Sequence, residues 1–151
     1  MHTAISSDKI DISSENNTED LAKKFLQKIK PGHIIFLYGE IGVGKTTFLR
    51  YLINELQKKN KLKKTEVTSP TFNLLNEYQI DKIKIKHFDL FRIKSSEELE
   101  NLDLFADSLK SLIFIEWPQI IKEKPKNLIE LIFNYENDHK GRSVQIVGLH
   151  L

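Results

Sequence analysis

The stretch that decides the fold is the segment Gly39-Glu40-Ile41-Gly42-Val43-Gly44-Lys45-Thr46. It matches the pattern G-x-x-x-x-G-K-[ST] in full, follows the apolar run at 34–38 and precedes an apolar helical repeat at 48–56. Glycines let successive backbone N–H groups point inward at phosphate oxygens, and the N-terminus of a helix adds partial positive charge there. A strand, a glycine-rich loop and a helix in this order predict a phosphate-binding loop, or P-loop.

The residue types in this loop predict the ligand. Lys45 is expected to neutralise the β- and γ-phosphates of ATP, and the Thr46 hydroxyl is expected to ligate Mg²⁺. ATP and Mg²⁺ are therefore the expected cofactors. The residues expected to contact the nucleotide here are Gly39, Glu40, Ile41, Gly42, Val43, Gly44, Lys45, Thr46 and Thr47.

The bulk composition narrows the class of protein. A chain of 151 residues supplies one hydrophobic core, so a single P-loop ATPase domain is expected over residues 1–151. The formal net charge of +2 argues against a dedicated nucleic-acid binder, and no direct DNA partner is expected. There is no cysteine, which excludes disulfides and cysteine-ligated zinc.

Hydropathy gives no sign of a membrane protein. No apolar run approaches the roughly 20 residues that a helix needs to span a bilayer. Residues 1–17 are polar and lack the apolar stretch of a signal peptide. A cytoplasmic protein without a membrane partner is the expectation.

The remaining pattern predicts an α/β fold, with a mixed β-sheet, flanking helices and antiparallel hairpins. Thr18 is the expected N-cap of a helix that carries apolar residues to Ile29. Alternation from Phe72 to Ile80, a turn and a return over 83–87 predict one hairpin. Residues 112–115 form a short apolar run typical of a buried strand, and residues 128–135 and 143–149 flank a terminal turn. Periodicity leaves the order of the strands open.

Two acidic residues follow predicted strands and are candidates for the metal. A P-loop protein needs a carboxylate at the end of a neighbouring strand, to hold Mg²⁺ directly or through water. Glu116 follows the strand at 112–115 and suits that role, while Asp89 could hold a metal-bound water or orient the attacking water. Ordinary surface carboxylates are the alternative for both. The expected catalytic set is Lys45, Asp89 and Glu116.

Several rival classes lack their motifs. The D-x-x-G pattern of Ras-type GTPases fails at Asp89, which is followed by Leu90-Phe91-Arg92, and their N-K-x-D pattern fails at Asn60-Lys61, which is followed by Leu62-Lys63. The L-S-G-G-Q stretch of ABC ATPases is missing. A small-molecule kinase usually stabilises the transferred phosphoryl group with several arginines. Only Arg50, Arg92 and Arg142 are present, which disfavours a stand-alone P-loop kinase but leaves it as the alternative.

Four blocks of the chain resemble the TsaE family of bacterial tRNA threonylcarbamoyladenosine biosynthesis ATPases. They are L-Y-G-E-I-G-V-G-K-T-T-F at 37–48, V-T-S-P-T-F at 67–72, H-F-D-L-F-R at 87–92 and I-E-W-P at 115–118. The resemblance spans about residues 14–149. Its main departure is at Glu40 and Phe91, where the family commonly has Asp and Tyr.

The resemblance implies a function and further residues. It implies an accessory ATPase that works with TsaD and TsaB, which transfer a threonylcarbamoyl group onto the adenosine next to the anticodon, so tRNA is an indirect partner. By the same resemblance, Glu15, Gln119 and Arg142 are expected at the nucleotide. Ser69, Pro70, Thr71, Phe72 and Trp117 are expected to form a γ-phosphate switch or partner surface; a plain turn and a tryptophan at the edge of the core are the alternatives. His87 is expected to be structural, because the P-loop mechanism needs no histidine.

Overall fold

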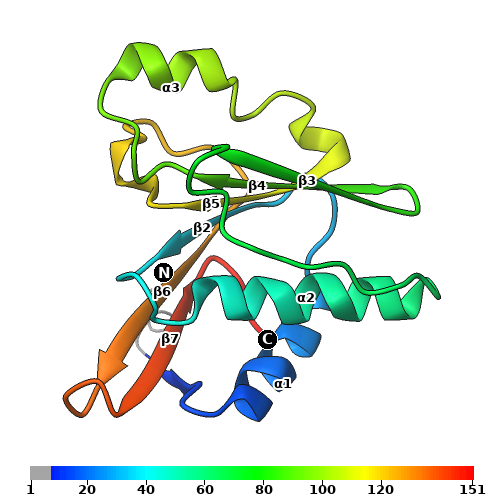
Figure 1. The fold of residues 1–151 in the computed structure, drawn as a ribbon, viewed down its shortest axis with the longest axis vertical. Coiled ribbons are helices and arrows are strands. Elements are labelled where there is room, and N and C mark those ends of the chain that lie inside the picture. Colours follow the sequence, from blue (N-terminus) through cyan, green and yellow to red (C-terminus); the bar gives the residue numbers. More distant parts are fainter. Residues whose placement is uncertain (1–7) are drawn as a thin grey trace.

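The protein is described by a computed structural model, in which residues 8–151 are placed; expectations that concern residues 1–7 lie outside this range. Within it, seven strands form one mixed sheet with helices on both faces (Figure 1). The strands are β1 (Ile10–Asp11), β2 (Ile34–Tyr38), β3 (Leu75–Ile80), β4 (Ile83–Asp89), β5 (Ser111–Glu116), β6 (Leu128–Glu136) and β7 (Gly141–Val147). The helices are α1 (Glu15–Leu26), α2 (Lys45–Lys59) and α3 (Ser96–Leu102), with short 3-10 turns at Ser108–Lys110 and Pro118–Ile120.

The strand order is β1-β7-β6-β2-β5-β4-β3. The four central strands β6, β2, β5 and β4 are parallel, and β3–β4, β6–β7 and β1–β7 are antiparallel pairs. Every residue of β5 is buried, as expected for a parallel strand covered on both faces. The predicted α/β class, the two hairpins and the buried strands are therefore confirmed.

The start of α1 differs from the prediction. The N-cap is Ser14, whose hydroxyl accepts a hydrogen bond from the Asn17 N–H at 3.1 Å. Thr18 is buried inside the helix, and its hydroxyl donates to the Ser14 carbonyl at 3.3 Å. Residues 15–17 face solvent, so the apolar repeat begins one turn later than the helix does. The helix also ends earlier than predicted, at Leu26.

The start of β3 also differs from the prediction. The strand begins at Leu75, and Phe72 lies in a turn with 79% of its surface exposed. The Leu74 N–H donates to the Pro70 carbonyl at 2.9 Å, and Leu74 has φ of +67°. A residue in this left-handed conformation cannot continue a strand, so the apparent alternation from Phe72 does not correspond to extended backbone.

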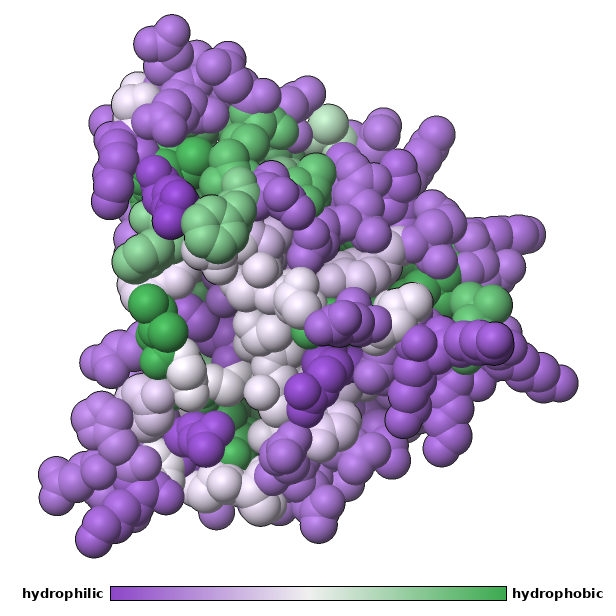
Figure 2. Space-filling model, in the orientation of Figure 1, coloured by the Kyte–Doolittle hydropathy of each residue, from purple (hydrophilic) through white to green (hydrophobic). Residues whose placement is uncertain are grey.

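The lysine-rich connection after α2 lies at the surface. The helix ends at Lys59, and residues 61–66 are exposed without helix or strand structure. Figure 2 shows this end of the molecule as largely hydrophilic. No helix in residues 8–151 is long and apolar enough to cross a membrane.

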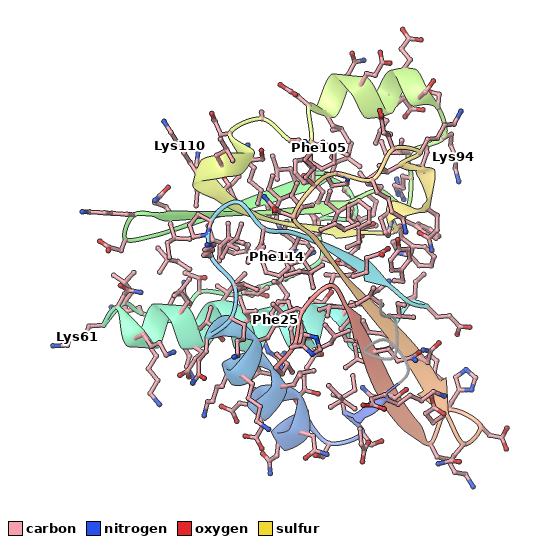
Figure 3. The ribbon with its side chains drawn as sticks, turned by 180° about the vertical axis from the view of Figure 1, so that it is seen from behind. Phe25, Lys61, Lys94, Phe105, Lys110 and Phe114 are labelled. Atoms are coloured by element: carbon pink, nitrogen blue, oxygen red, sulfur yellow. The ribbon has the colours of Figure 1, made fainter. Side chains whose placement is uncertain are left out.

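The sheet carries a hydrophobic layer on each face. The larger layer lies between the sheet and helices α1 and α2, where the Phe48 ring packs edge-on against both Phe25 and Phe133. Figure 3 shows Phe25 and Phe114 in this layer, and Phe105 in the smaller layer under α3. This packing holds α2, and therefore the P-loop that precedes it, against the sheet.

Candidate nucleotide site

The carboxyl ends of the parallel strands bring the predicted site residues to one edge of the sheet. β2 runs into the P-loop, β5 ends at Glu116 and β4 ends at Asp89. In the register, Glu116 is paired with Leu37 on one side and with Asp89 on the other. Open α/β sheets bind ligands at this edge, so the topology itself places a loop, a helix N-terminus and two acids together.

The glycines of the P-loop meet two different requirements. Gly39 has φ of +147°, and a Cβ there would lie 2.8 Å from Val43 Cγ1, so both conformation and packing exclude a side chain. Gly44 has φ of +118° and occupies the N-cap of α2 without any side-chain cap. The first N–H groups of α2 are therefore open to an anion, as helix N-termini in phosphate sites are.

Lys45 is a buried cation at the start of α2, with 5% of its surface exposed. Its Nζ donates to the Gly39 carbonyl, lies 3.8 Å from Glu116 Oε1 and sits 4.3 Å from the centroid of the Trp117 ring. Burial lowers the pKa of Lys45, while the carboxylates of Glu116 and Asp89 act in the opposite direction. The amine is thus held at the phosphate loop by a carbonyl, a carboxylate and an aromatic face.

The two acids are both buried, which excludes the alternative that they are surface carboxylates. Glu116 is 3% exposed, and its Oε2 lies 2.6 Å from Nε2 of the fully buried His87. Asp89 is 4% exposed; its Oδ2 accepts from the Ser69 hydroxyl at 2.8 Å and its Oδ1 from the Phe91 N–H at 3.0 Å. Asp89 therefore ties the loop around Ser69 to the end of β4.

A pocket of about 260 Å³ opens at these residues. Its lining consists of Ile41, Gly42, Gly44, Lys45, Thr46, Thr47, Ser69, Thr71, Asp89, Phe91, Glu116 and Trp117. The structure thus brings together all three predicted catalytic residues and much of the predicted switch. Phe91 also lines this pocket, although no role was predicted for it from the sequence. Its position two residues after Asp89 is the feature of the sequence that could have indicated it.

A second pocket, of about 290 Å³, adjoins the other side of the P-loop. It is lined by Ile12, Ser13, Ser14, Glu15, Thr18, Gly44, Thr47, Arg50 and Arg142. Glu15 and Arg142 therefore lie near the loop from distant parts of the chain. Arg50 was not predicted, although it lies three residues after Thr47 and so on the same face of α2. Its guanidinium contacts Glu15 Oε1 at 2.9 Å.

The remaining predicted residues lie outside these two pockets. Gln119 lines a third hollow, which shares Phe91 and Trp117 with the first pocket. Gly39 and Val43 support the loop from within, and Glu40 points toward His139 at 3.9 Å. Pro70 is buried beneath the loop, and the exposed Phe72 ring lies 4.4 Å from the Arg92 guanidinium.

The donor groups of the first pocket fit a magnesium ion. The Thr46 hydroxyl and the carboxylates of Glu116 and Asp89 are oxygen ligands, which Mg²⁺ prefers. Residues 8–151 contain no cluster of three or more acidic, histidine or cysteine side chains that could hold a metal by themselves. Mg²⁺ commonly binds through one or two carboxylates together with phosphate oxygens and water, so this set suits a metal that arrives with a nucleotide.

A strand, a glycine loop over the N-terminus of a helix, and a carboxylate on the neighbouring parallel strand define the fold of a P-loop NTPase. The chain resembles the crystal structure of Bacillus subtilis YdiB with a TM-score of 0.67 and 20% identity, over 91% of this chain and 82% of that one. A family model described as "Threonylcarbamoyl adenosine biosynthesis protein TsaE" matches residues 12–144. The chain belongs to the TsaE family.

Curated relatives agree with that assignment. The tRNA threonylcarbamoyladenosine biosynthesis protein TsaE of Rickettsia prowazekii is 45% identical over 112 residues, which are 74% of each chain. The protein of the same name from Borreliella burgdorferi is 36% identical over 92% of this chain and 98% of its own. The one from Aquifex aeolicus is 36% identical over 87% and 91%. The family resemblance predicted from the four sequence blocks is confirmed.

Proposed function

We propose that this protein binds Mg²⁺-ATP in the first pocket and hydrolyses it in support of the complex that installs threonylcarbamoyl on tRNA. The observation that carries the proposal is the buried pair Lys45–Glu116, with 3.8 Å between the amine and the carboxylate, directly beside Thr46. A buried cation, a buried acid and a hydroxyl at one helix N-terminus form the arrangement that phosphoryl transfer requires.

Each residue has a role in this proposal. Lys45 and the open N–H groups of α2 bind the β- and γ-phosphates. Thr46 and Glu116 hold Mg²⁺, which neutralises charge on the phosphates when it is bound. Asp89 orients the attacking water, since its carboxylate lines the pocket on the neighbouring strand.

The second pocket takes the nucleoside part of ATP in this proposal. Gly44 and Thr47 line both pockets, so a ligand anchored on the P-loop can extend from one into the other. Glu15, Arg50 and Arg142 offer charged and hydrogen-bonding groups to the ribose and the base.

The partners in this proposal are TsaD and TsaB, with tRNA reached through them. The names of the relatives place those proteins in tRNA threonylcarbamoyladenosine biosynthesis. Two apolar side chains that line the first pocket are exposed, Ile41 (72%) and Phe91 (45%), and the exposed Phe72 (79%) directly follows Thr71 of the same lining. Figure 2 shows apolar surface below α3 and again beside the P-loop. Exposed apolar groups around a reactive site favour a protein partner that covers it.

The test measures ATP hydrolysis by the pure protein, alone and with TsaD and TsaB, next to Lys45→Ala. We expect slow hydrolysis that rises when both partners are present, and none above background in the variant. A pull-down with TsaD and TsaB, with and without nucleotide, measures the association directly. Phosphorylated product from a panel of small acceptors, without any partner effect, would instead identify a kinase.

A further inference from the structure

We propose that His87 is a positioning residue for Glu116 and thereby sets the affinity of the site for its divalent cation. The inference rests on the proposed role of Glu116 as a metal ligand. It concerns a buried group with no part in the reaction scheme above and no contact with either pocket.

The sheet brings the two side chains together. His87 lies in β4 opposite Phe114 of β5, and Glu116 is two residues further along β5 on the same face. Their contact, Nε2 to Oε2, is 2.6 Å long and buried on both sides. The other oxygen, Oε1, is the one that faces Lys45 at 3.8 Å. One carboxylate oxygen of Glu116 is therefore held by His87 inside the sheet, and the other faces the phosphate pocket.

The hydrogen bond determines the tautomer of the imidazole. An ionised carboxylate only accepts, so Nε2 carries the proton and donates it to Glu116. The other ring nitrogen, Nδ1, is buried and has no hydrogen-bond partner among residues 8–151. Burying Nδ1 without a hydrogen-bond partner costs desolvation free energy, which an apolar side chain in the same space would avoid. Within the described part of the chain, the polar contact that the imidazole makes is therefore the one with Glu116.

Lys45 cannot take over this positioning. In the proposed function its amine binds phosphate, and it already contacts the Gly39 carbonyl and the Trp117 ring. His87 lines neither pocket, so its bond to Glu116 does not compete with a nucleotide. Carboxylates that bind metals are commonly oriented by such a second hydrogen bond, and its loss typically costs about 10–100-fold in metal affinity.

The experiment titrates Mg²⁺ into the full-length protein with a non-hydrolysable ATP analogue and records binding calorimetrically. His87→Gln places an amide N–H near the position of Nε2, whereas the shorter His87→Asn cannot reach Glu116. We expect His87→Asn to raise the Mg²⁺ concentration for half-saturation about tenfold or more, and His87→Gln to stay within about threefold of wild type. Binding of the analogue in EDTA should be unchanged in both.

Two controls separate positioning from general damage to β4. Lys86→Met alters the adjacent buried residue, whose amine donates a hydrogen bond of 3.0 Å to the Ala106 carbonyl. Neither Lys86 nor Ala106 lines the first pocket, so this variant should leave the Mg²⁺ titration unchanged. Thermal unfolding shows whether each variant is folded. If His87→Asn does not fold, His87→Leu refills the space without a donor and is expected to raise the half-saturation concentration in the same way.

The outcomes distinguish this inference from the proposed function. If Glu116→Gln shifts the Mg²⁺ titration but His87→Asn does not, His87 only fills the core and the inference is overturned alone. Equal losses in EDTA and in Mg²⁺ overturn it as well, because they indicate a general structural effect. If Glu116→Gln itself has no effect, the metal role of Glu116 is wrong and this inference falls with it, while the proposed ATP hydrolysis stands with Asp89 as the metal ligand.

Discussion

Two ion pairs lie on either side of the phosphate loop, and they differ in burial more than in chemistry. Lys45 Nζ lies 3.8 Å from Glu116 Oε1, and both side chains are 4% exposed. Arg50 Nη2 lies 2.9 Å from Glu15 Oε1, and these side chains are 43% and 67% exposed. The shorter distance belongs to the pair that water screens more strongly.

Burial, and not distance, therefore decides which pair matters more. Removing one partner of a buried ion pair leaves an uncompensated charge and typically costs about 3–5 kcal/mol. An exposed pair typically contributes about 0–1 kcal/mol, because water and salt screen it. The metal side of the loop is accordingly preorganised, whereas the outer side can rearrange around a ligand at little cost.

The largest effect is expected from Lys45→Ala, which removes the cation of the buried ion pair. The variant loses the cation that offsets phosphate charge, while the backbone cradle remains. We expect ATP affinity to fall by about 100-fold or more, measured by calorimetry. Lys58→Ala, on the exposed end of the same helix, is the matched control. Unchanged ATP binding by folded Lys45→Ala protein would contradict the P-loop assignment.

Glu116→Gln tests the other partner of the buried pair. The amide keeps the size of the side chain but removes the charge that a metal needs. We expect Mg²⁺-dependent hydrolysis to fall by about 10–100-fold, with nucleotide affinity in EDTA within about threefold of wild type. Hydrolysis at the wild-type rate across a Mg²⁺ titration would shift the metal role to Asp89.

A smaller effect is expected from Thr71→Ala, in the Ser69–Phe72 loop beside the buried pair. Trp117, the sole tryptophan, lies 4.3 Å from the Lys45 amine, and both Trp117 and Thr71 line the phosphate pocket. We expect its fluorescence to differ between ADP and a non-hydrolysable ATP analogue, and Thr71→Ala to reduce that difference. Ordering of a loop by the γ-phosphate is the physical reason.

The matched control for this switch is Thr68→Ala, which alters the exposed residue directly before this loop, a residue that does not line the pocket. It should leave the fluorescence difference intact. Identical spectra with the two nucleotides, together with nucleotide-independent binding to TsaD and TsaB, would leave a static ATP-binding adaptor in place of a switch.

The smallest effect is expected from Arg50→Ala, which breaks the exposed pair. We expect the free energy of unfolding to change by less than about 1 kcal/mol, measured by urea denaturation. The double variant with Glu15→Gln should show a coupling within the same limit. A coupling energy like that of a buried pair would mean that exposure does not govern the difference between the two sides of the loop.

Local pattern alone predicted much of this protein. The P-loop, the buried strands on either side of it, both hairpins, and the acids Asp89 and Glu116 follow from short motifs and from the period of apolar residues. These features depend on the conformation of neighbouring residues, which a few consecutive side chains largely determine. The TsaE resemblance rests on the same short blocks.

Other features were decided only by the tertiary structure. The order of the strands, the departure of Phe72 from β3, the placement of Arg50 beside Glu15 and the contact of His87 with Glu116 were all unavailable from pattern. Each depends on which faces pack together across long separations in the chain. The free energy of that packing comes from the folded sheet and its two hydrophobic layers as a whole, so no single stretch of sequence encodes it.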